Sequence, residues 1–143
     1  MLTLENEITY PFINEFLSEI IRQNDPLLCE MEDYARMKHI PIIQRESARF
    51  LELLCLLAKP HRILEIGTAI GYSSIVLAKT LNRDGIVDTV EMNEEMVTEA
   101  NRYIRRAGLD KAIRVINGDA AEVLQCLNTP YDFIFVDAAK GQY

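Results

Sequence analysis

The sequence predicts an α/β protein in which a doubly wound parallel sheet follows an N-terminal helical part. Two observations lead to this prediction: residues 1–60 carry helical patterns, and residues 61–143 carry four short apolar strands with helices between them. Such alternation favours a parallel sheet with right-handed crossover connections. The length of 143 residues suits one domain, and no repeat or linker divides it, so we expect a single domain over 1–143.

Three helices are expected in the N-terminal part. Apolar residues spaced three and four apart predict a helix over 10–22. Asp25 followed by Pro26 is typical of an N-cap and a first helical turn, and this pair opens a helix that runs to about Lys38. A third helix, very apolar on one side, is expected over 44–58. Together these helices form the N-terminal part that precedes the sheet.

The remaining chain is expected to build the sheet. The predicted strands, each short and apolar, cover 62–67, 85–91, 113–118 and 132–137. Helices are expected over 70–81, over 93–107 and after Asp119, which is typical of an N-cap. Gly108 suits the position that closes the second of these helices. We expect the strand order 3-2-1-4.

Charge and cysteine usage limit the possible partners. The formal net charge of −7 gives the protein no general attraction for phosphate backbones. A nucleic-acid substrate would need a local basic patch, for which residues 36–39 and 102–114 are candidates, although solvated helix faces explain both segments more simply. Three scattered cysteines favour buried thiols over disulfides and suit the reducing cytoplasm. No apolar stretch approaches a membrane span, so we expect a cytoplasmic protein with no membrane partner.

The first strand-to-helix turn, "ILEIGTAIGYSS" (63–74), is the strongest signal in the chain. Gly67 lets a ligand approach the backbone closely, and the helix that follows presents free N–H groups. Gly67 and Gly71 are spaced G-x-x-x-G, which does not fit the dinucleotide fingerprint G-x-G-x-x-G. A phosphate-binding P-loop does not fit either, because no Gly-Lys-Ser/Thr follows.

Two further strand ends carry polar residues. Glu91 ends the second predicted strand, 24 residues after Gly67, and a carboxylate there can accept hydrogen bonds from both hydroxyls of a ribose. The third strand ends in "NGDA" (117–120), which is well placed to contact an adenine edge. The three strand ends thus offer a turn for a small polar tail, an acid for a ribose and a base contact, without phosphate-binding chemistry. This set favours S-adenosylmethionine over NAD.

The last predicted strand is followed by an acid and a base. In "YDFIFVDAAKGQY" (131–143) the run FIFV has the pattern of a strand buried on both faces. Asp137 follows at once and Lys140 comes three residues later. Ligands of parallel α/β sheets bind outside the carboxyl ends of the strands, so this acid and base are expected where chemistry would occur.

These motifs resemble the cation-dependent class I O-methyltransferases, the Rossmann-like family of catechol and caffeoyl-CoA methyltransferases. "EIGTAIGYSS" looks like the family's first cofactor motif, "VEMN" its ribose motif, "NGDA" its adenine motif and "FVDAAKGQY" its metal and catalytic motif. The resemblance runs from about residue 40 to the end of the chain. "HIPII", "ILEIGTAIGYSS" and "DAAKGQY" look most like bacterial tRNA 5-hydroxyuridine methyltransferases, which make 5-methoxyuridine at the wobble position.

The resemblance implies roles for individual residues. It implies a site for S-adenosylmethionine made by eight residues, which are Ile43, Glu65, Gly67, Ser73, Glu91, Asp119, Ala120 and Asp137. It further implies that Asp137 ligates a divalent cation such as Mg²⁺. Asp137 and Lys140 would be the catalytic residues, with Lys140 helping to deprotonate the acceptor hydroxyl. The family also forms homodimers, so a homodimer is expected here.

The sequence departs from the family pattern after the fourth strand. Two further metal ligands, an Asp-Asn pair, lie beyond that strand in the family, and this chain has no residues there. We therefore expect an incomplete sheet over 61–143 and a C-terminally truncated methyltransferase. Besides the tRNA hypothesis, three alternatives remain: an O-methyltransferase of a small catechol-like or phenolic acceptor, an inactive cofactor-binding fragment and, more distantly, an NAD-dependent oxidoreductase.

Overall fold

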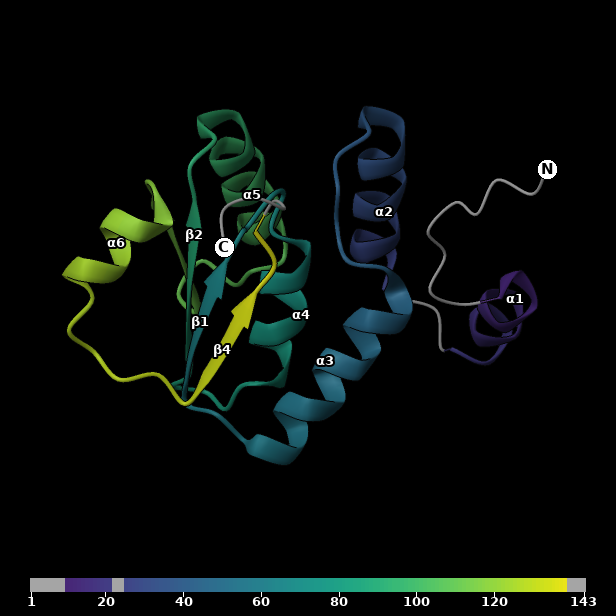
Figure 1. The fold of residues 1–143 in the computed structure, drawn as a ribbon, viewed down its shortest axis with the longest axis horizontal. Helices are drawn as coiled ribbons and strands as arrows, with labels where there is room; N and C mark the ends of the chain where they lie inside the picture. The colour runs from purple at the N-terminus through teal and green to yellow at the C-terminus, as the bar shows by residue number, and fades with distance from the viewer. Residues whose placement is uncertain (1–9, 22–24, 139–143) are drawn as a thin grey trace.

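The computed structural model describes residues 10–21 and 25–138, and its elements alternate as predicted (Figure 1). Within these residues the elements, in chain order, are α1 (Pro11–Ile20), α2 (Pro26–Lys38), α3 (Arg45–Ala58), β1 (Arg62–Ile66), α4 (Tyr72–Thr80), β2 (Ile86–Glu91), α5 (Glu94–Arg106), β3 (Ile113–Asn117), α6 (Ala120–Cys126) and β4 (Phe133–Val136).

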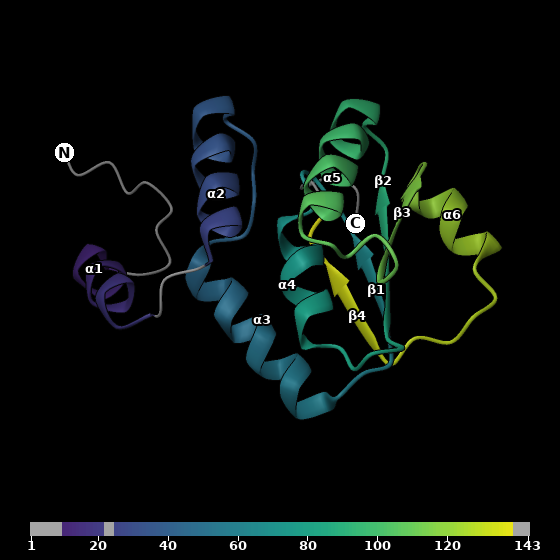
Figure 2. The same ribbon diagram turned by 180° about the vertical axis from the view of Figure 1, so that it is seen from behind.

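The four strands form one parallel sheet in the order β3-β2-β1-β4, which confirms the predicted order. The chain starts the sheet at β1, moves outward to β2 and β3, and returns past β1 to β4. Figures 1 and 2 show α4 and α5 covering one face, with α3 and α2 beyond them, and α6 on the opposite face. Because all strands are parallel, their carboxyl ends meet at one edge of the sheet.

The main core lies between the sheet and the helices α2 to α5. Ile63 of β1, Val87 of β2 and Ile113 of β3 point toward these helices and are buried. Ile75 and Leu77 of α4 pack against them and are completely buried. The helix α4 is buried over most of its length because the sheet lies on one side of it and α3 on the other.

The opposite face of the sheet has a smaller core. Leu64, Ile66 and Val90 are buried there, with Val123 of α6 packed against them. The short helix α6 lies over part of this face only (Figure 1). Because the helices cover the two faces of the sheet unequally, the two faces of β4 are buried to different extents.

The prediction that FIFV is buried on both faces is wrong for the described residues. Strand β4 lies at the edge of the sheet, next to β1 only, and its side chains alternate. Phe133 and Phe135 pack against the main core, whereas Ile134 and Val136 are 59% and 47% exposed. The sequence shows that the strand is apolar, but it does not show which face of the strand a helix will cover.

Local capping signals locate several helix boundaries well. The Asp25 carboxylate accepts a hydrogen bond from the Leu28 backbone N–H at 2.9 Å, so the predicted N-cap of α2 is confirmed. The helix α4 begins at Tyr72 rather than at residue 70, because Gly71 serves as its N-cap with φ +84°. The predicted closing role of Gly108 is consistent with its φ of +69° just after α5.

The sequence predicts that the cysteines are buried thiols and that no apolar stretch approaches a membrane span. Cys55 is fully buried and Cys29 half-buried, but Cys126 is exposed at the end of α6, so the expectation of a buried thiol is wrong there. The helix α6 leaves its outer side to solvent, which the sequence alone does not reveal. None of the helices in the described ranges is long and apolar enough to cross a membrane.

Candidate functional site at the carboxyl edge of the sheet

Backbone hydrogen bonds join the ends of all four strands at the carboxyl edge. The Gly67 N–H donates to the Val90 carbonyl at 3.0 Å and ties the turn after β1 to β2. The Gly118 N–H donates to the Glu91 carbonyl at 3.0 Å, and the Asp137 N–H donates to the Ile66 carbonyl at 2.9 Å. The predicted cofactor turn, ribose acid, adenine segment and final acid are therefore neighbours along one edge.

The turn after β1 is tightly packed and held by unusual backbone conformations. Gly67 has φ +96°, and a Cβ built on it would lie 2.6 Å from the Asp137 carbonyl oxygen. Only glycine fits there without moving the backbone beyond β4. Ala69 has φ +44°, a left-handed conformation that a side chain makes unfavourable. The surrounding contacts must therefore hold this residue in place.

The Glu91 carboxylate supplies that contact. One oxygen, Oε2, accepts a hydrogen bond from the Ala69 backbone N–H at 2.9 Å. The other, Oε1, accepts from the Asn93 backbone N–H at 2.9 Å. Each oxygen keeps a second lone pair, so the fixed carboxylate can still accept hydrogen bonds from a ligand. Glu91 thus orients the turn as well as offering the ribose contact that the sequence predicts.

Glu65 lies beneath the turn in a buried network of hydroxyls. Its side chain is completely buried, and its Oε2 accepts hydrogen bonds from the Ser74 hydroxyl and from the Thr89 hydroxyl, the latter at 2.6 Å. The Thr68 and Thr89 hydroxyls are 2.6 Å apart. Burial raises the pKa of the Glu65 carboxyl above its ordinary value of 4.5, although the nearby hydroxyls of Ser73, Ser74 and Thr89 act in the opposite direction.

The other predicted cofactor residues lie on separate elements. Ser73 is buried in the first turn of α4, directly after the glycine turn. Asp119 caps α6 by accepting a hydrogen bond from the Ala121 N–H at 2.7 Å, and it is exposed beside half-buried Ala120. Ile43 lies in the segment between α2 and α3 and packs, half-buried, against the main core.

The predicted metal and catalytic centre is only partly described. Asp137 is exposed just after β4, and desolvation of its carboxyl raises its pKa above 3.8. Lys140 lies outside the described residues. Among the residues that the structure describes, no group of three or more histidines, cysteines, aspartates or glutamates could hold a metal ion. One carboxylate does not make a metal site, so the described residues do not fit the implied cation by themselves.

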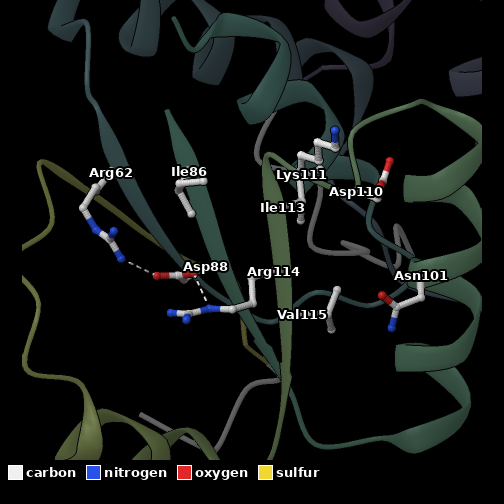
Figure 3. A pocket seen from close by; sticks show the side chains of 9 residues that line it. All are labelled: Arg62, Ile86, Asp88, Asn101, Asp110, Lys111, Ile113, Arg114 and Val115. Atoms are coloured by element: carbon white, nitrogen blue, oxygen red, sulfur yellow. Dashed lines mark hydrogen bonds and ion pairs between the residues drawn. The ribbon is translucent and has the colours of Figure 1, made fainter. Parts of the chain in front are cut away.

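A separate ion cluster lies at the opposite, amino end of the strands. The buried Asp88 carboxylate accepts hydrogen bonds from Arg62 at 2.9 Å, from Arg114 at 2.8 Å and from the Tyr131 hydroxyl at 2.8 Å. Arg62, Asp88 and Arg114 border a hollow of about 530 Å³. Figure 3 shows Arg62, Asp88 and Arg114 on one side of β3 and Asn101 on the other, so the side chains do not converge on one ligand. We interpret this cluster as structural.

The two basic segments are largely paired within the protein. Arg102 pairs with Glu99, and Arg106 forms two hydrogen bonds of 2.6 Å with Glu30. Arg114 is bound to Asp88, and Arg36 to Asp33. These ion pairs favour the simpler interpretation of the segments as helix and strand surfaces, and they weaken the case for a basic patch there.

The sequence analysis missed the hydroxyl network around Glu65. Thr68, Thr89 and Ser74 are fully or almost fully buried although they are polar. A signal was present, because "IVDTVE" places Asp88 and Thr89 inside an otherwise apolar strand, and buried polar groups need hydrogen-bond partners. The partners themselves lie far away in sequence and could not be named from it.

The fold and the converging strand ends define a Rossmann-like α/β protein with a candidate ligand site at the carboxyl edge of its sheet. A sequence model of the O-methyltransferase family matches residues 18–143. The chain therefore belongs to the O-methyltransferase family.

Comparison with individual proteins agrees with this assignment. Catechol O-methyltransferase of Niastella koreensis is 30% identical over 98% of this chain and 66% of its own length. The crystal structure of the O-methyltransferase from Bacillus cereus in complex with SAH matches with a TM-score of 0.82 and 33% identity, over 90% of this chain and 61% of that one. The structure of TomG from Streptomyces achromogenes in complex with SAM gives a TM-score of 0.82 and 31% identity, with coverages of 90% and 60%. The chain thus spans 60–66% of the length of these relatives.

Proposed function

We propose that the protein is an S-adenosylmethionine-dependent O-methyltransferase that binds its cofactor along the carboxyl edge of the sheet. The observation that carries the proposal is the Glu91 carboxylate, which two backbone N–H groups fix beside the glycine turn. The turn has no dinucleotide fingerprint, which speaks against NAD. Family membership and the relatives solved with SAM and SAH support the same cofactor.

The residues of this edge would bind and orient the cofactor. Glu91 would accept hydrogen bonds from the ribose hydroxyls with its remaining lone pairs. The first turn of α4, at Ser73, would hold the carboxylate of the amino-acid end, because N–H groups at a helix start are free to bind an anion. Asp119 and Ala120 would flank the adenine. When bound, S-adenosylmethionine supplies a methyl group on a positively charged sulfur.

Calorimetry tests the cofactor assignment. S-adenosylhomocysteine should bind the protein and NAD should not. The variant Glu91→Gln should weaken binding about tenfold to a hundredfold, because charge-assisted hydrogen bonds to the ribose are lost (about 1–3 kcal/mol). Glu95→Gln, an exposed residue of α5, is the matched control and should bind like the unaltered protein. Unchanged affinity in Glu91→Gln would remove Glu91 from the site.

For the acceptor, we propose 5-hydroxyuridine at the wobble position of tRNA, which also implies a cytoplasmic location. Support comes from "HIPII", "ILEIGTAIGYSS" and "DAAKGQY", which look most like the tRNA enzymes. A small catechol-like or phenolic acceptor is the second candidate. The named catechol O-methyltransferase relatives, the net charge of −7 and the paired basic segments favour it.

Transfer from labelled S-adenosylmethionine to hydroxyuridine-containing tRNA and to catechol, measured side by side, separates these candidates. Methyl transfer to oxygen needs an ionised hydroxyl, and Lys140 is the residue proposed to help remove its proton. Lys140→Met should therefore abolish transfer to either acceptor while cofactor binding persists. Cofactor binding without transfer to any acceptor would instead support a non-catalytic cofactor-binding module.

We also propose that transfer requires Mg²⁺ or a similar hard cation with Asp137 as one ligand. Carboxylate oxygen suits such ions, and Asp137 stands exposed at the end of β4. The described residues provide no complete site, so other ligands would have to join it. Activity should be lost on chelation and restored by Mg²⁺. Turnover that survives thorough chelation would reject the proposal.

Finally, we propose a homodimer in which α3 packs against α3 of a second copy. Five large apolar residues of this helix are exposed: Phe50, Leu53, Leu54, Leu56 and Leu57. A self-complementary contact covers this surface on both copies with the same residues. Light scattering should show a dimer that Leu57→Glu dissociates, whereas Met37→Glu, an exposed methionine of α2, leaves it intact. A monomer at high concentration would contradict the proposal.

A further inference from the structure

The two oxygens of the Glu65 carboxyl differ in the hydrogen bonds that they accept. Both hydroxyls that bond to it, those of Ser74 and Thr89, donate to Oε2. The other oxygen, Oε1, is buried and has no hydrogen-bond partner in the part of the chain that the structure describes. A buried carboxylate is stable only when its charge is compensated and its oxygens accept hydrogen bonds. Glu65 meets these conditions on one side only.

Counting hydrogens fixes the direction of this network. The Thr89 hydroxyl has one hydrogen, and it is directed to Oε2 of Glu65 at 2.6 Å. Thr68 must therefore be the donor across the 2.6 Å contact between the two threonine hydroxyls. The Ser74 hydroxyl likewise gives its single hydrogen to Oε2. Neither Ser74 nor Thr89 therefore has a hydrogen left for Oε1. The Ser73 hydroxyl also acts on Glu65 and lowers its pKa, but it forms no hydrogen bond to Oε1 in the part of the chain that the structure describes.

The charged groups around Glu65 increase this imbalance. Asp137, beyond the end of β4, adds a negative charge that acts on Glu65 without a hydrogen bond between them. Strand β2 carries two acids: the Asp88 carboxylate is bound to Arg62 and Arg114, and the Glu91 carboxylate is bound to Ala69 and Asn93. From α4, Ser73 and Ser74 are uncharged, and the Tyr72 hydroxyl donates to Glu32 instead. Burial is the main cause that favours the neutral carboxyl and raises its pKa, and the charge of Asp137 acts in the same direction.

We propose that Glu65 carries a proton on Oε1 in the free protein and that binding of S-adenosylmethionine, or of its demethylated product, releases this proton to solvent. The proton belongs on Oε1 because Oε2 already accepts two hydrogen bonds. Glu65 lies two residues before Gly67 and is tied to the first turn of α4 through Ser74, where the amino-acid end of the cofactor would bind. The ammonium group of that end brings a positive charge and hydrogen-bond donors, so the ionised carboxylate becomes the favoured form.

The inference rests on the proposed cofactor site and makes Glu65 a coupling point between cofactor affinity and pH. The exchange is balanced: the carboxylic acid loses one proton, the cofactor ammonium keeps its own, and an ion pair replaces a neutral group. Cofactor affinity should therefore rise with pH while Glu65 is protonated in the free protein, because proton release then becomes easier.

Calorimetry in two buffers with different ionisation enthalpies counts the released protons. With S-adenosylhomocysteine at mildly acidic pH, the unaltered protein should release close to one proton per ligand. Glu65→Gln should bind the ligand and release none, whereas Glu95→Gln should behave like the unaltered protein. Thr89→Val, which removes one donor from Oε2, should hold the proton more tightly, so release should persist to higher pH.

The outcomes separate the inference from the function on which it rests. Ligand binding without proton release in the unaltered protein overturns the inference and leaves the cofactor site intact. If no ligand binds, the cofactor assignment fails, and carbon-13 NMR of glutamate-labelled free protein still tests the protonated state. The carboxyl signal of Glu65 is identified by its absence from the spectrum of Glu65→Gln. In the unaltered protein this signal should titrate above the ordinary glutamate range. A signal that titrates near 4.5 would overturn the inference.

Discussion

Replacing Gly67 by alanine should destabilise the protein far more than replacing Gly108, although both glycines have positive φ angles of +96° and +69°. A left-handed backbone costs an alanine about 1–2 kcal/mol at either position. At Gly108 nothing lies within 4 Å of the new Cβ, so this conformational cost is the whole effect. Gly108→Ala is therefore a matched control for the conformational part of the Gly67 effect.

At Gly67 the new methyl group meets backbone atoms that cannot rotate away. It would lie 2.6 Å from the Asp137 carbonyl oxygen and 2.9 Å from the carbonyl carbon. Overpacking of this kind costs about 1–3 kcal/mol. Moving the chain beyond β4 outward also endangers the hydrogen bond from the Asp137 N–H to Ile66, which contributes about 1 kcal/mol. We expect a total loss of about 3–6 kcal/mol for Gly67→Ala.

Urea denaturation followed by circular dichroism measures both variants on one scale. The midpoint of Gly67→Ala should fall well below that of Gly108→Ala, with the slope m unchanged in both. Equal losses in the two variants would show that the close approach between the turn and the Asp137 backbone is not a real constraint. That result would refute the reasoning that places the end of β4 directly against the glycine turn.

Three further predictions concern the interior of the sheet. Asp88→Ala should cost about 3–5 kcal/mol, because it leaves two arginines and a tyrosine hydroxyl without their shared acceptor, whereas exposed Arg114→Ala should cost about 1 kcal/mol in the same urea assay. The pKa of Glu65 is raised in the folded protein, so its contribution to stability is complete below pH 4.5, the ordinary pKa, and is lost as the pH rises through the folded-state pKa. In melting experiments at different pH, Glu65→Gln should therefore show a smaller loss of stability over this range than the unaltered protein. Ile63→Ala should cost about 2–5 kcal/mol, and Ile134→Ala, 59% exposed, less than 1 kcal/mol.

Much of the fold could be predicted because its signals are local. Asp25 and Asp119 each cap a helix with a side chain that reaches only two or three residues ahead, so the sequence reveals both positions. The short apolar strands separated by helices indicate a parallel sheet without any knowledge of contacts. Boundaries were less certain where the backbone conformation decides them, as at Gly71, which delays the start of α4 to Tyr72.

The residue types of the candidate site could be predicted from the sequence, but the hydrogen bonds between those residues could not. Gly67, Glu91 and Asp137 are recognisable because each comes at the end of a strand, and the structure brings these strand ends together. The bond from Glu91 to Ala69 could not be predicted, because it depends on the left-handed conformation of an alanine. Such a conformation is held by the surrounding structure rather than favoured by the residue itself.

The sequence by itself determined which segments become strands and helices, because periodicity, caps and glycines act over a few residues. It also determined the chemistry available at the carboxyl edge, from a glycine turn to Glu91 and Asp137. Only the tertiary structure decided that Ile134 of FIFV faces solvent, since this depends on the cover that α6 leaves incomplete. It also decided that one oxygen of Glu65 accepts the hydrogen bonds of both Ser74 and Thr89, because those donors are 9 and 24 residues away and meet only after β1, β2 and α4 have packed.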